Sequence, residues 1–308
     1  MIINAGCPTR CYVHFRHAET WSESDQAKER DPMSYKTVLV HIDSGKRCAT
    51  RVEVAIGLAM QHDAHLVALY ALAPFIPPAY VMMQMGPEVI EAQKHAVEAE
   101  MARAEEVFTK QTSAAGLSNV EWRTANDDPV YAMPLHARYA DIVVIGQSDA
   151  SDASDVATNF PARLVLAVDR PVLIVPSVGS YPSIGKRILV AWNASREAAK
   201  AVTEAMPLLK LADNVVVMAV NPRYGEHGST PGADIGLYLA RHGVHVDVEM
   251  NPGNEIDVGN ELLSRATDLS VDLLVMGGYG HSRLKEWVLG GATRTILESM
   301  TIPVLMSH

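Results

Sequence analysis

A glycine-rich segment near the C-terminus, GGYGHSRLKEWVLGGATR (277–294), has the residue types and spacing of a ligand-binding loop. Gly277 follows the apolar run VDLLVM, Gly280 comes after two further residues, and Gly290 and Gly291 come after nine more. Glycine lets the backbone turn tightly or approach another group closely, because it has no Cβ. The last glycine pair opens a predicted helix, whose free N–H groups and positive dipole end favour a phosphate. The segment therefore predicts an anion site, and a glycine-rich turn without a ligand is the alternative.

Other patterns that could carry chemistry are weaker. Four side chains of the kinds that bind zinc lie within eleven residues, at Cys7, Cys11, His14 and His17. They are more closely spaced than in zinc fingers and no core-forming segment separates them, so we assign no metal site. The sequence has no nucleophile elbow and no HExxH motif. We therefore name no catalytic residue and leave enzymatic activity open.

The composition limits the partners and the location of the protein. The chain has 308 residues, of which 48% are hydrophobic and 20% charged, as in a packed globular protein. The net charge of -10 argues against a nucleic-acid partner, which needs a basic surface. No apolar stretch reaches the length of a bilayer span, so we expect no membrane association. Three cysteines and the lack of an apolar signal core indicate a cytoplasmic protein.

The chain contains two copies of one pattern of strands and helices. KTVLVHIDSG (36–45) corresponds to RILVAWNAS (187–195), DIVVIGQ (141–147) to DLLVMGG (272–278), and RPVLIVPS (170–177) to IPVLMSH (302–308). The strands are short apolar runs, typical of buried parallel sheets, and helical patterns alternate with them. We expect an α/β fold with a disordered tail at 1–34, domains at 35–177 and 187–308, and a linker at 178–186.

Two helices are predicted in more detail. In the helix after the first strand, helical spacing predicts an inner face made of Val52, Ala55, Ile56, Ala59 and Met60. A long helix from Pro87 to about Gln111 belongs to the first copy only. It accounts for most of the residues by which the first copy exceeds the second.

The spacing G-x2-G-x9-G, the strand ILVA ending in a polar residue, and the final PVL strand together resemble the universal stress protein family. The resemblance covers residues 35–308. It implies two tandem Rossmann-like domains of the adenine nucleotide alpha hydrolase-like type, each a five-stranded parallel sheet with helices on both faces. It also implies ATP or another adenine nucleotide as ligand, with or without Mg2+. The PVL strands would pair the two domains with each other, or two chains as a homodimer.

The resemblance implies a nucleotide site in the second copy. Asn193 stands where the family usually has an adenine-reading Asp, and an amide still offers a donor and an acceptor. Trp192 either stacks on a base or packs against the sheet. Gly291 replaces the family's usual Ser or Thr, which removes one phosphate contact that Thr293 would replace. The complete set of expected site residues is Ala191, Trp192, Asn193, Val220, Met276, Gly277, Gly280, His281, Ser282, Gly290, Gly291, Ala292 and Thr293.

The first copy departs further from the family pattern. It keeps Asp43 at the end of its first strand, but its later loop carries Asp149, Asp152 and Asp155. Their charges would repel a phosphate, so we expect nucleotide binding to be lost there. The whole chain is then expected to be a nucleotide-binding sensor or regulator of the stress response. The alternatives are a nucleotide-free interaction module and a weak ATPase or autophosphorylating protein.

Overall fold

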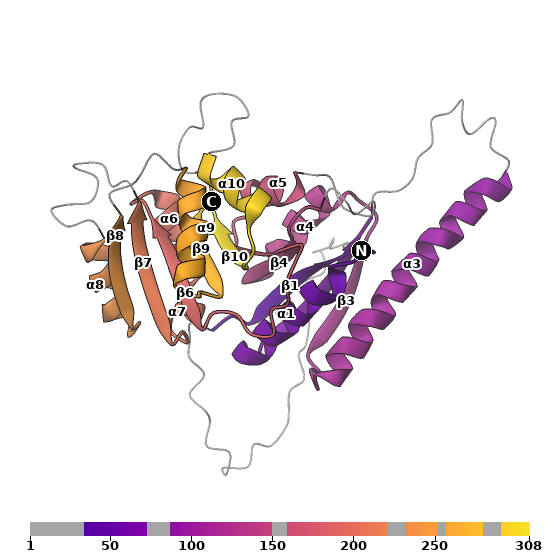
Figure 1. Cartoon of the computed structure of the whole chain (residues 1–308). Coiled ribbons are helices and arrows are strands. Elements are labelled where there is room, and N and C mark those ends of the chain that lie inside the picture. The colour runs from indigo at the N-terminus through magenta and orange to yellow at the C-terminus, as the bar shows by residue number, and fades with distance from the viewer. Residues whose placement is uncertain (1–33, 73–86, 150–158, 221–231, 252–256, 280–290) are drawn as a thin grey trace, which may run out of the picture. The chain divides into compact units, whose positions relative to one another are not determined.

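The computed structural model describes residues 34–72, 87–149, 159–220, 232–251, 257–279 and 291–308 (Figure 1). The first half of the chain contains β1 (Thr37–Ile42), α1 (Cys48–His62), β2 (His65–Ala71), α3 (Pro87–Ala114), β3 (Val120–Ala125), α4 (Pro129–Ala137), β4 (Ile142–Gly146), α5 (Phe160–Ala167) and β5 (Val172–Val175). The long helix predicted from Pro87 is confirmed as α3 and extends one turn further than expected.

The second half repeats this order of strands and helices. It contains β6 (Arg187–Trp192), α6 (Arg196–Glu204), α7 (Met206–Leu209), β7 (Asn214–Val220), α8 (Ala233–Arg241), β8 (Val246–Asn251), α9 (Val258–Asp268), β9 (Leu273–Gly277), α10 (Gly291–Ser299) and β10 (Val304–Ser307). The α/β fold expected from the alternating pattern is therefore confirmed. Within the described residues, no helix has the length and apolarity needed to cross a bilayer.

The ten strands in the described part of the chain form one sheet, in the order β3-β2-β1-β4-β5-β10-β9-β6-β7-β8. The strands within each half run parallel to one another, and β5 pairs with β10 in the antiparallel direction. The second half thus repeats the strand order of the first, and the two five-stranded units are joined edge to edge by their last strands.

The core forms two layers because alternate residues of each buried strand face opposite sides of the sheet. In β1, Val38 and Val40 belong to the layer that includes α1 and α6, whereas Leu39 belongs to the opposite layer, which includes α4, α5, α9 and α10. The helices therefore cover both faces of the sheet (Figure 1). The inner face predicted for α1 is correct for Val52, Ala55, Ile56 and Ala59 but wrong for Met60, which is 55% exposed.

An aspartate before the fourth strand anchors the first strand in each half. Asp141 Oδ2 accepts hydrogen bonds from the backbone N–H groups of Lys36 (2.6 Å) and Thr37 (2.9 Å). Asp272 accepts three equivalent bonds from the backbone before and at the start of β6, with distances from 3.0 to 3.1 Å. The two halves can therefore be compared residue by residue.

Candidate functional site

The strand order reverses between β1 and β4 in the first half and between β6 and β9 in the second. At such a point the connections leave for opposite faces of the sheet, and a ligand can bind between them at the carboxyl ends of the strands. In the second half, Ala191 of β6 pairs with Met276 of β9. The structure therefore brings Asn193 and Gly277, both predicted from the sequence, to one edge of the sheet.

Asn193 forms the turn between β6 and α6 and is exposed. Its Oδ1 accepts a hydrogen bond from Ser195 N at 3.2 Å, and Ser195 Oγ caps α6 by accepting one from Ala198 N at 3.1 Å. Ala194 between them has a φ of 58°, in the left-handed region. Because Oδ1 is engaged in the turn, the Nδ2 group is the part of Asn193 that can donate a hydrogen bond to a ligand.

Gly277 and Gly278 are both approached closely by other parts of the chain. A Cβ on Gly277 would lie 2.5 Å from Ala198 N and 2.6 Å from Glu197 C, in the first turn of α6. A Cβ on Gly278 would lie 3.0 Å from Val165 Cγ1 of α5, in the first half. The packing of α6 and α5 therefore accounts for these two glycines by itself.

Helix α10 begins at Gly291, beside the ends of β9 and α9. Thr293 is buried, and its Oγ1 accepts a hydrogen bond from Tyr279 N at 3.4 Å, so this hydroxyl connects the helix to the loop after β9. Asp257 Oδ1 lies 3.5 Å from the position that a Cβ on Gly291 would take. The positive end of the α10 dipole thus already faces one carboxylate.

Several predicted residues contribute their main chain rather than their side chain to this edge. Met276 is 5% exposed and belongs to the core, and the partly buried Trp192 also packs against the core, on the side of α6. Val220 ends β7, and its side chain is outside what the structure describes. The same holds for the predicted Gly280, His281, Ser282 and Gly290, and for Cys7, Cys11, His14, His17, Asp152 and Asp155.

Tyr279 belongs to this edge, although sequence reasoning did not select it. Its φ of 60° is unusual for a residue with a side chain. The ring meets that of His308 edge-on, with 6.3 Å between centroids, and His308 Nδ1 lies 3.0 Å from Gly278 O. The hydroxyl is buried without a hydrogen-bond partner in the described residues, and burial raises the pKa of Tyr279 to about 12. The sequence feature that could have drawn attention to Tyr279 is its position among the glycines of GGYG.

A buried ion pair occupies the equivalent place in the first half. Arg51 Nη2 lies 2.7 Å from Asp43 Oδ2, and Arg51 Nε donates to His41 O at 2.7 Å. Asp43 Oδ1 accepts a hydrogen bond from Gly45 N at 3.0 Å. Asn193 forms the same kind of turn in the second half, where its Oδ1 accepts from Ser195 N. Burial alone would raise the pKa of Asp43, but the guanidinium of Arg51 holds that pKa below its usual value. Asp43 is therefore charged and already partnered at neutral pH.

His41 completes this cluster beneath the ion pair. It is 1% exposed and packs against Phe160 of α5, with 5.1 Å between ring centroids. Burial lowers the pKa of His41 to about 4, which outweighs the opposing effect of Asp43 at 3.6 Å. The imidazole is therefore neutral at physiological pH. Its Nε2 is buried and has no hydrogen-bond partner among the described residues.

The two halves differ in side-chain size at this point. Val38 of β1 pairs with Ile142, and Ile188 of β6 pairs with Leu273. These equivalent pairings show which residue of the second half corresponds to each residue of the first. The first half carries three large side chains, and the second half has a methyl group at each equivalent position: His41, Arg51 and Phe160 correspond to Ala191, Ala201 and Ala292. The side chains that fill the first switch point are thus truncated at the second.

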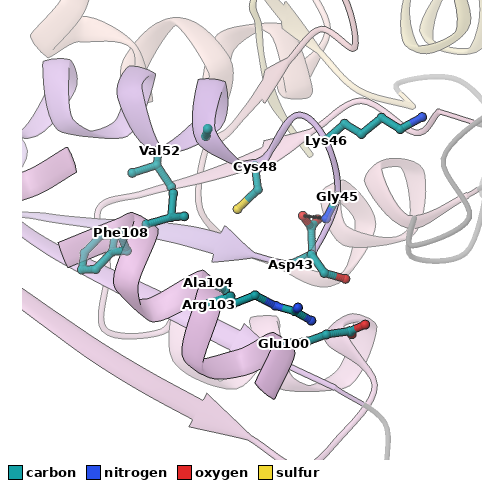
Figure 2. Close-up of a pocket in the computed structure, with 12 residues that line it drawn as sticks. Asp43, Gly45, Lys46, Cys48, Val52, Glu100, Arg103, Ala104 and Phe108 are labelled. Atoms are coloured by element: carbon teal, nitrogen blue, oxygen red, sulfur yellow. Dashed lines mark hydrogen bonds between the residues drawn. The ribbon is translucent and has the colours of Figure 1, made fainter. Parts of the chain in front are cut away.

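The described residues also enclose a pocket of about 450 Å³ in the first half, between the β1–α1 turn and α3 (Figure 2). Val52 and Phe108 contribute apolar surface, and the Cys48 thiol points into the space toward α3. Glu100 and Arg103 line the pocket from α3. Burial raises the pKa of Cys48, so its thiol is protonated at neutral pH. Asp43 also lines this pocket, whereas none of the residues expected to form the site of the second copy does. The pocket depends on the position of α3.

The described residues hold no group of three or more His, Cys, Asp or Glu side chains placed to bind a metal ion. Among the described residues, the second switch point offers main-chain N–H groups, the Asn193 amide, the Tyr279 phenol, the Thr293 hydroxyl, the Asp257 carboxylate and small apolar side chains. This set can bind a planar polar ring and an anion.

Among known proteins, universal stress protein Slr1230 from Synechocystis sp. (strain ATCC 27184 / PCC 6803 / Kazusa) is 27% identical to this chain over 148 residues. The match covers 46% of this chain and 48% of that protein, so the chain spans about half the length of this curated relative. A universal stress protein from Archaeoglobus fulgidus DSM 4304 has a TM-score of 0.66 and 15% identity, and the match covers 89% of this chain and 97% of that one.

A functionally unknown protein from Pseudomonas aeruginosa PAO1 has a TM-score of 0.55 and 15% identity, covering 89% of this chain and 93% of that one. At these identities the two solved structures support the fold alone. The Universal stress protein family matches residues 34–176 and 238–308, which is more than half of the chain. The chain therefore belongs to the universal stress protein family.

Proposed function

We propose that the second half binds an adenine nucleotide at the carboxyl ends of β6 and β9, and that the chain acts as a sensor or regulator in the stress response. The observation that carries the proposal is the difference between the two switch points. The large His41, Arg51 and Phe160 side chains of the first half are replaced by alanines in the second. Because the three large side chains are replaced by alanine around the second switch point, we expect space for a ligand there.

The polar groups around these alanines fit the two ends of a nucleotide. Asn193 Nδ2 can donate to a ring nitrogen of adenine, because Oδ1 is held by the Ser195 N–H. The first N–H groups of α10 suit a phosphate. Asp257 beside Gly291 would oppose an unaccompanied phosphate, and a bound Mg2+ would offset its charge. The fit is therefore better for a nucleotide that brings a cation.

The first half is proposed not to bind nucleotide. Asp43, which corresponds to Asn193, already forms an ion pair with Arg51 at 2.7 Å. A ligand would have to separate this pair and leave a carboxylate and a guanidinium without their partner, which is costly at a buried site. We propose that the first half stabilises the second through the β5–β10 edge, with residues 35–177 and 187–308 as the two domains. A cytoplasmic location, residues 178–186 as the linker and a further homodimer remain parts of this proposal.

Titration of the full chain with ATP and with AMP, with and without Mg2+, tests the proposed site. Ala292→Phe restores the side chain found in the first half and should weaken binding by about tenfold or more, because it fills the proposed site. Ser299→Phe is the matched control, since it adds the same ring at an exposed position of the same helix. Equal affinity in the Ala292→Phe variant, or no binding by the wild type, would contradict the proposal. Analysis of the incubated nucleotide for ADP distinguishes binding from slow hydrolysis.

A further inference from the structure

An exposed apolar surface lies on α4 and α5 of the first half, which pack side by side (Figure 1). We call it the α4–α5 surface, and its apolar residues are Tyr131 (59% exposed), Leu135 (51%), Tyr139 (77%) and Leu166 (49%). Tyr131 and Leu135 are one helical turn apart, and Tyr139 follows in the turn after α4, so the three form a stripe. Side chains of this size at such exposure form a patch rather than isolated apolar residues.

Three arginines border the stripe. The Arg163 guanidinium lies over the ring of Tyr131, 5.8 Å from its centroid. At the other end, Arg170 Nη2 donates to Arg138 O at 3.4 Å. The first contact connects α4 to α5, and the second connects the end of α4 to the turn between α5 and β5. Together they place positive charge along the stripe. No carboxylate of the described residues forms an ion pair with any of the three arginines.

The second half provides an internal control, because α9 and α10 correspond to α4 and α5. Asp128 and Asp257 cap α4 and α9 in the same way, by accepting from Val130 N (2.9 Å) and Gly259 N (3.1 Å). The order of buried, half-buried and exposed residues is identical over 130–139 and 259–268. The fold therefore requires the same exposure at each equivalent position but does not dictate which residue occupies it.

At every exposed apolar position of the α4–α5 surface, the second half has a polar residue. Tyr131, Leu135, Tyr139 and Leu166 correspond to Asn260, Ser264, Asp268 and Glu298. The arginines are equally specific to the first half, since Arg138, Arg163 and Arg170 correspond to Thr267, Thr295 and Ile302. The arginines of α9 and α10 are paired instead: Arg265 with Glu249 (2.6 Å) and Arg294 with Glu298 (2.8 Å).

We propose that the α4–α5 surface docks an acidic amphipathic segment of a partner protein. The apolar side of the segment would cover the tyrosines and leucines, and its carboxylates would pair with the three arginines. Tyrosine and arginine are the residues that contribute most to binding at protein interfaces. The charge complementarity is local, because the chain as a whole carries a net charge of -10.

Two other occupants fit the charges less well. A second copy meeting this surface face to face would bring six arginines into one interface without a carboxylate from the same surface, and like charges repel. A nucleic acid would match the arginines and tyrosines, but not Leu135 and Leu166 or the net charge of the chain. The acidic segment satisfies both the apolar and the basic components.

The test uses a display library of short peptides selected on the full-length protein. The selection is repeated on a variant with Tyr131→Asn, Leu135→Ser, Tyr139→Asp and Leu166→Glu, the residues that the second half tolerates at the same positions. A control variant carries Leu237→Ser and Tyr238→Asn, which remove exposed apolar residues of α8. Circular dichroism and thermal unfolding establish that each variant is folded.

We expect the selection on the wild type to enrich peptides that contain acidic and apolar residues. These peptides should bind the wild type and the α8 control equally. The α4–α5 variant should bind them about tenfold more weakly or not at all. Raised salt should weaken binding to the wild type, because Arg138 and Arg170 are exposed. The proposal is wrong if no peptide is enriched, if the enriched peptides are basic, or if the α4–α5 variant binds them equally well.

Two further measurements distinguish the alternative occupants. Sedimentation would show wild-type dimers that dissociate in the α4–α5 variant if the occupant were a second copy. Anisotropy with a labelled single-stranded oligonucleotide would show binding lost in the same variant if the occupant were a nucleic acid. Either result would overturn the acidic segment as the partner.

Discussion

Replacing Arg51 by alanine tests whether its ion pair with Asp43 holds the first half together. Arg51 is 4% exposed and the Asp43 side chain 15%, so the variant leaves a nearly buried carboxylate without its partner 2.7 Å away. Removing one member of a buried pair costs about 3–5 kcal/mol. Arg51→Ala should therefore lower the free energy of unfolding by about that amount, whereas Arg103→Ala, at an exposed arginine of α3, should change it by less than about 0.5 kcal/mol.

The second half supplies the variant that should rescue the loss. Asp43→Asn together with Arg51→Ala reproduces the combination of Asn193 and Ala201, which the same fold already contains. The double variant removes the unpaired charge and keeps the oxygen that accepts from Gly45 N. We expect it to be more stable than Arg51→Ala alone, and the two substitutions to be non-additive by about 1–3 kcal/mol.

Urea unfolding followed by circular dichroism measures the four proteins of this cycle. A cost below about 1 kcal/mol for Arg51→Ala would contradict a buried ion pair, because a buried unpaired carboxylate must cost more. So would costs of the two single substitutions that add to that of the double variant within about 0.5 kcal/mol. Additivity would mean that the two groups do not interact.

Two further predictions concern stability. The pKa of His41 is lowered from 6.5 to about 4, so the unfolded chain binds more protons between these pH values, and stability falls as the pH falls through this window. The lowered pKa corresponds to a loss of about 3 kcal/mol in the free energy of unfolding across this window. His41→Ala should remove this part of the pH dependence measured by urea unfolding. An unchanged dependence of stability on pH in the variant would contradict the prediction. Gly277→Ala should cost about 1–3 kcal/mol because its Cβ would lie 2.5 Å from Ala198 N. Gly57→Ala, with nothing within 4 Å, should instead be neutral or stabilising in thermal unfolding, and equal effects would argue against the packing explanation.

The sequence was sufficient for the elements that depend on local pattern. Apolar runs identified β1, β4, β6 and β9. Ser195 is of a residue type that caps helices, and its Oγ accepts from Ala198 N at the start of α6. The repeated order of these elements predicted the duplicated α/β fold. These signals survive without tertiary information because buried parallel strands are apolar on both faces.

Features that depend on contacts between distant segments could not be read in this way. Arg51 lies next to the predicted inner face of α1, and a charged residue in a helix is usually solvated, so nothing marked it as buried. The glycine motif was interpreted as room for a ligand, yet Gly277 and Gly278 are approached by α6 and by Val165 of the other half. The pocket beside α3 also required the packing of elements that are far apart in the sequence.

Photoaffinity labelling with 8-azido-ATP, followed by peptide mapping, most directly tests where the nucleotide binds. The full chain is labelled with and without excess ATP, and the modified peptides are identified by mass spectrometry. Binding at the second switch point predicts ATP-protected labelling confined to peptides from 187–308 and abolished by Ala292→Phe. ATP-protected labelling of the peptides around Asp43, or labelling that ATP does not protect, would contradict it.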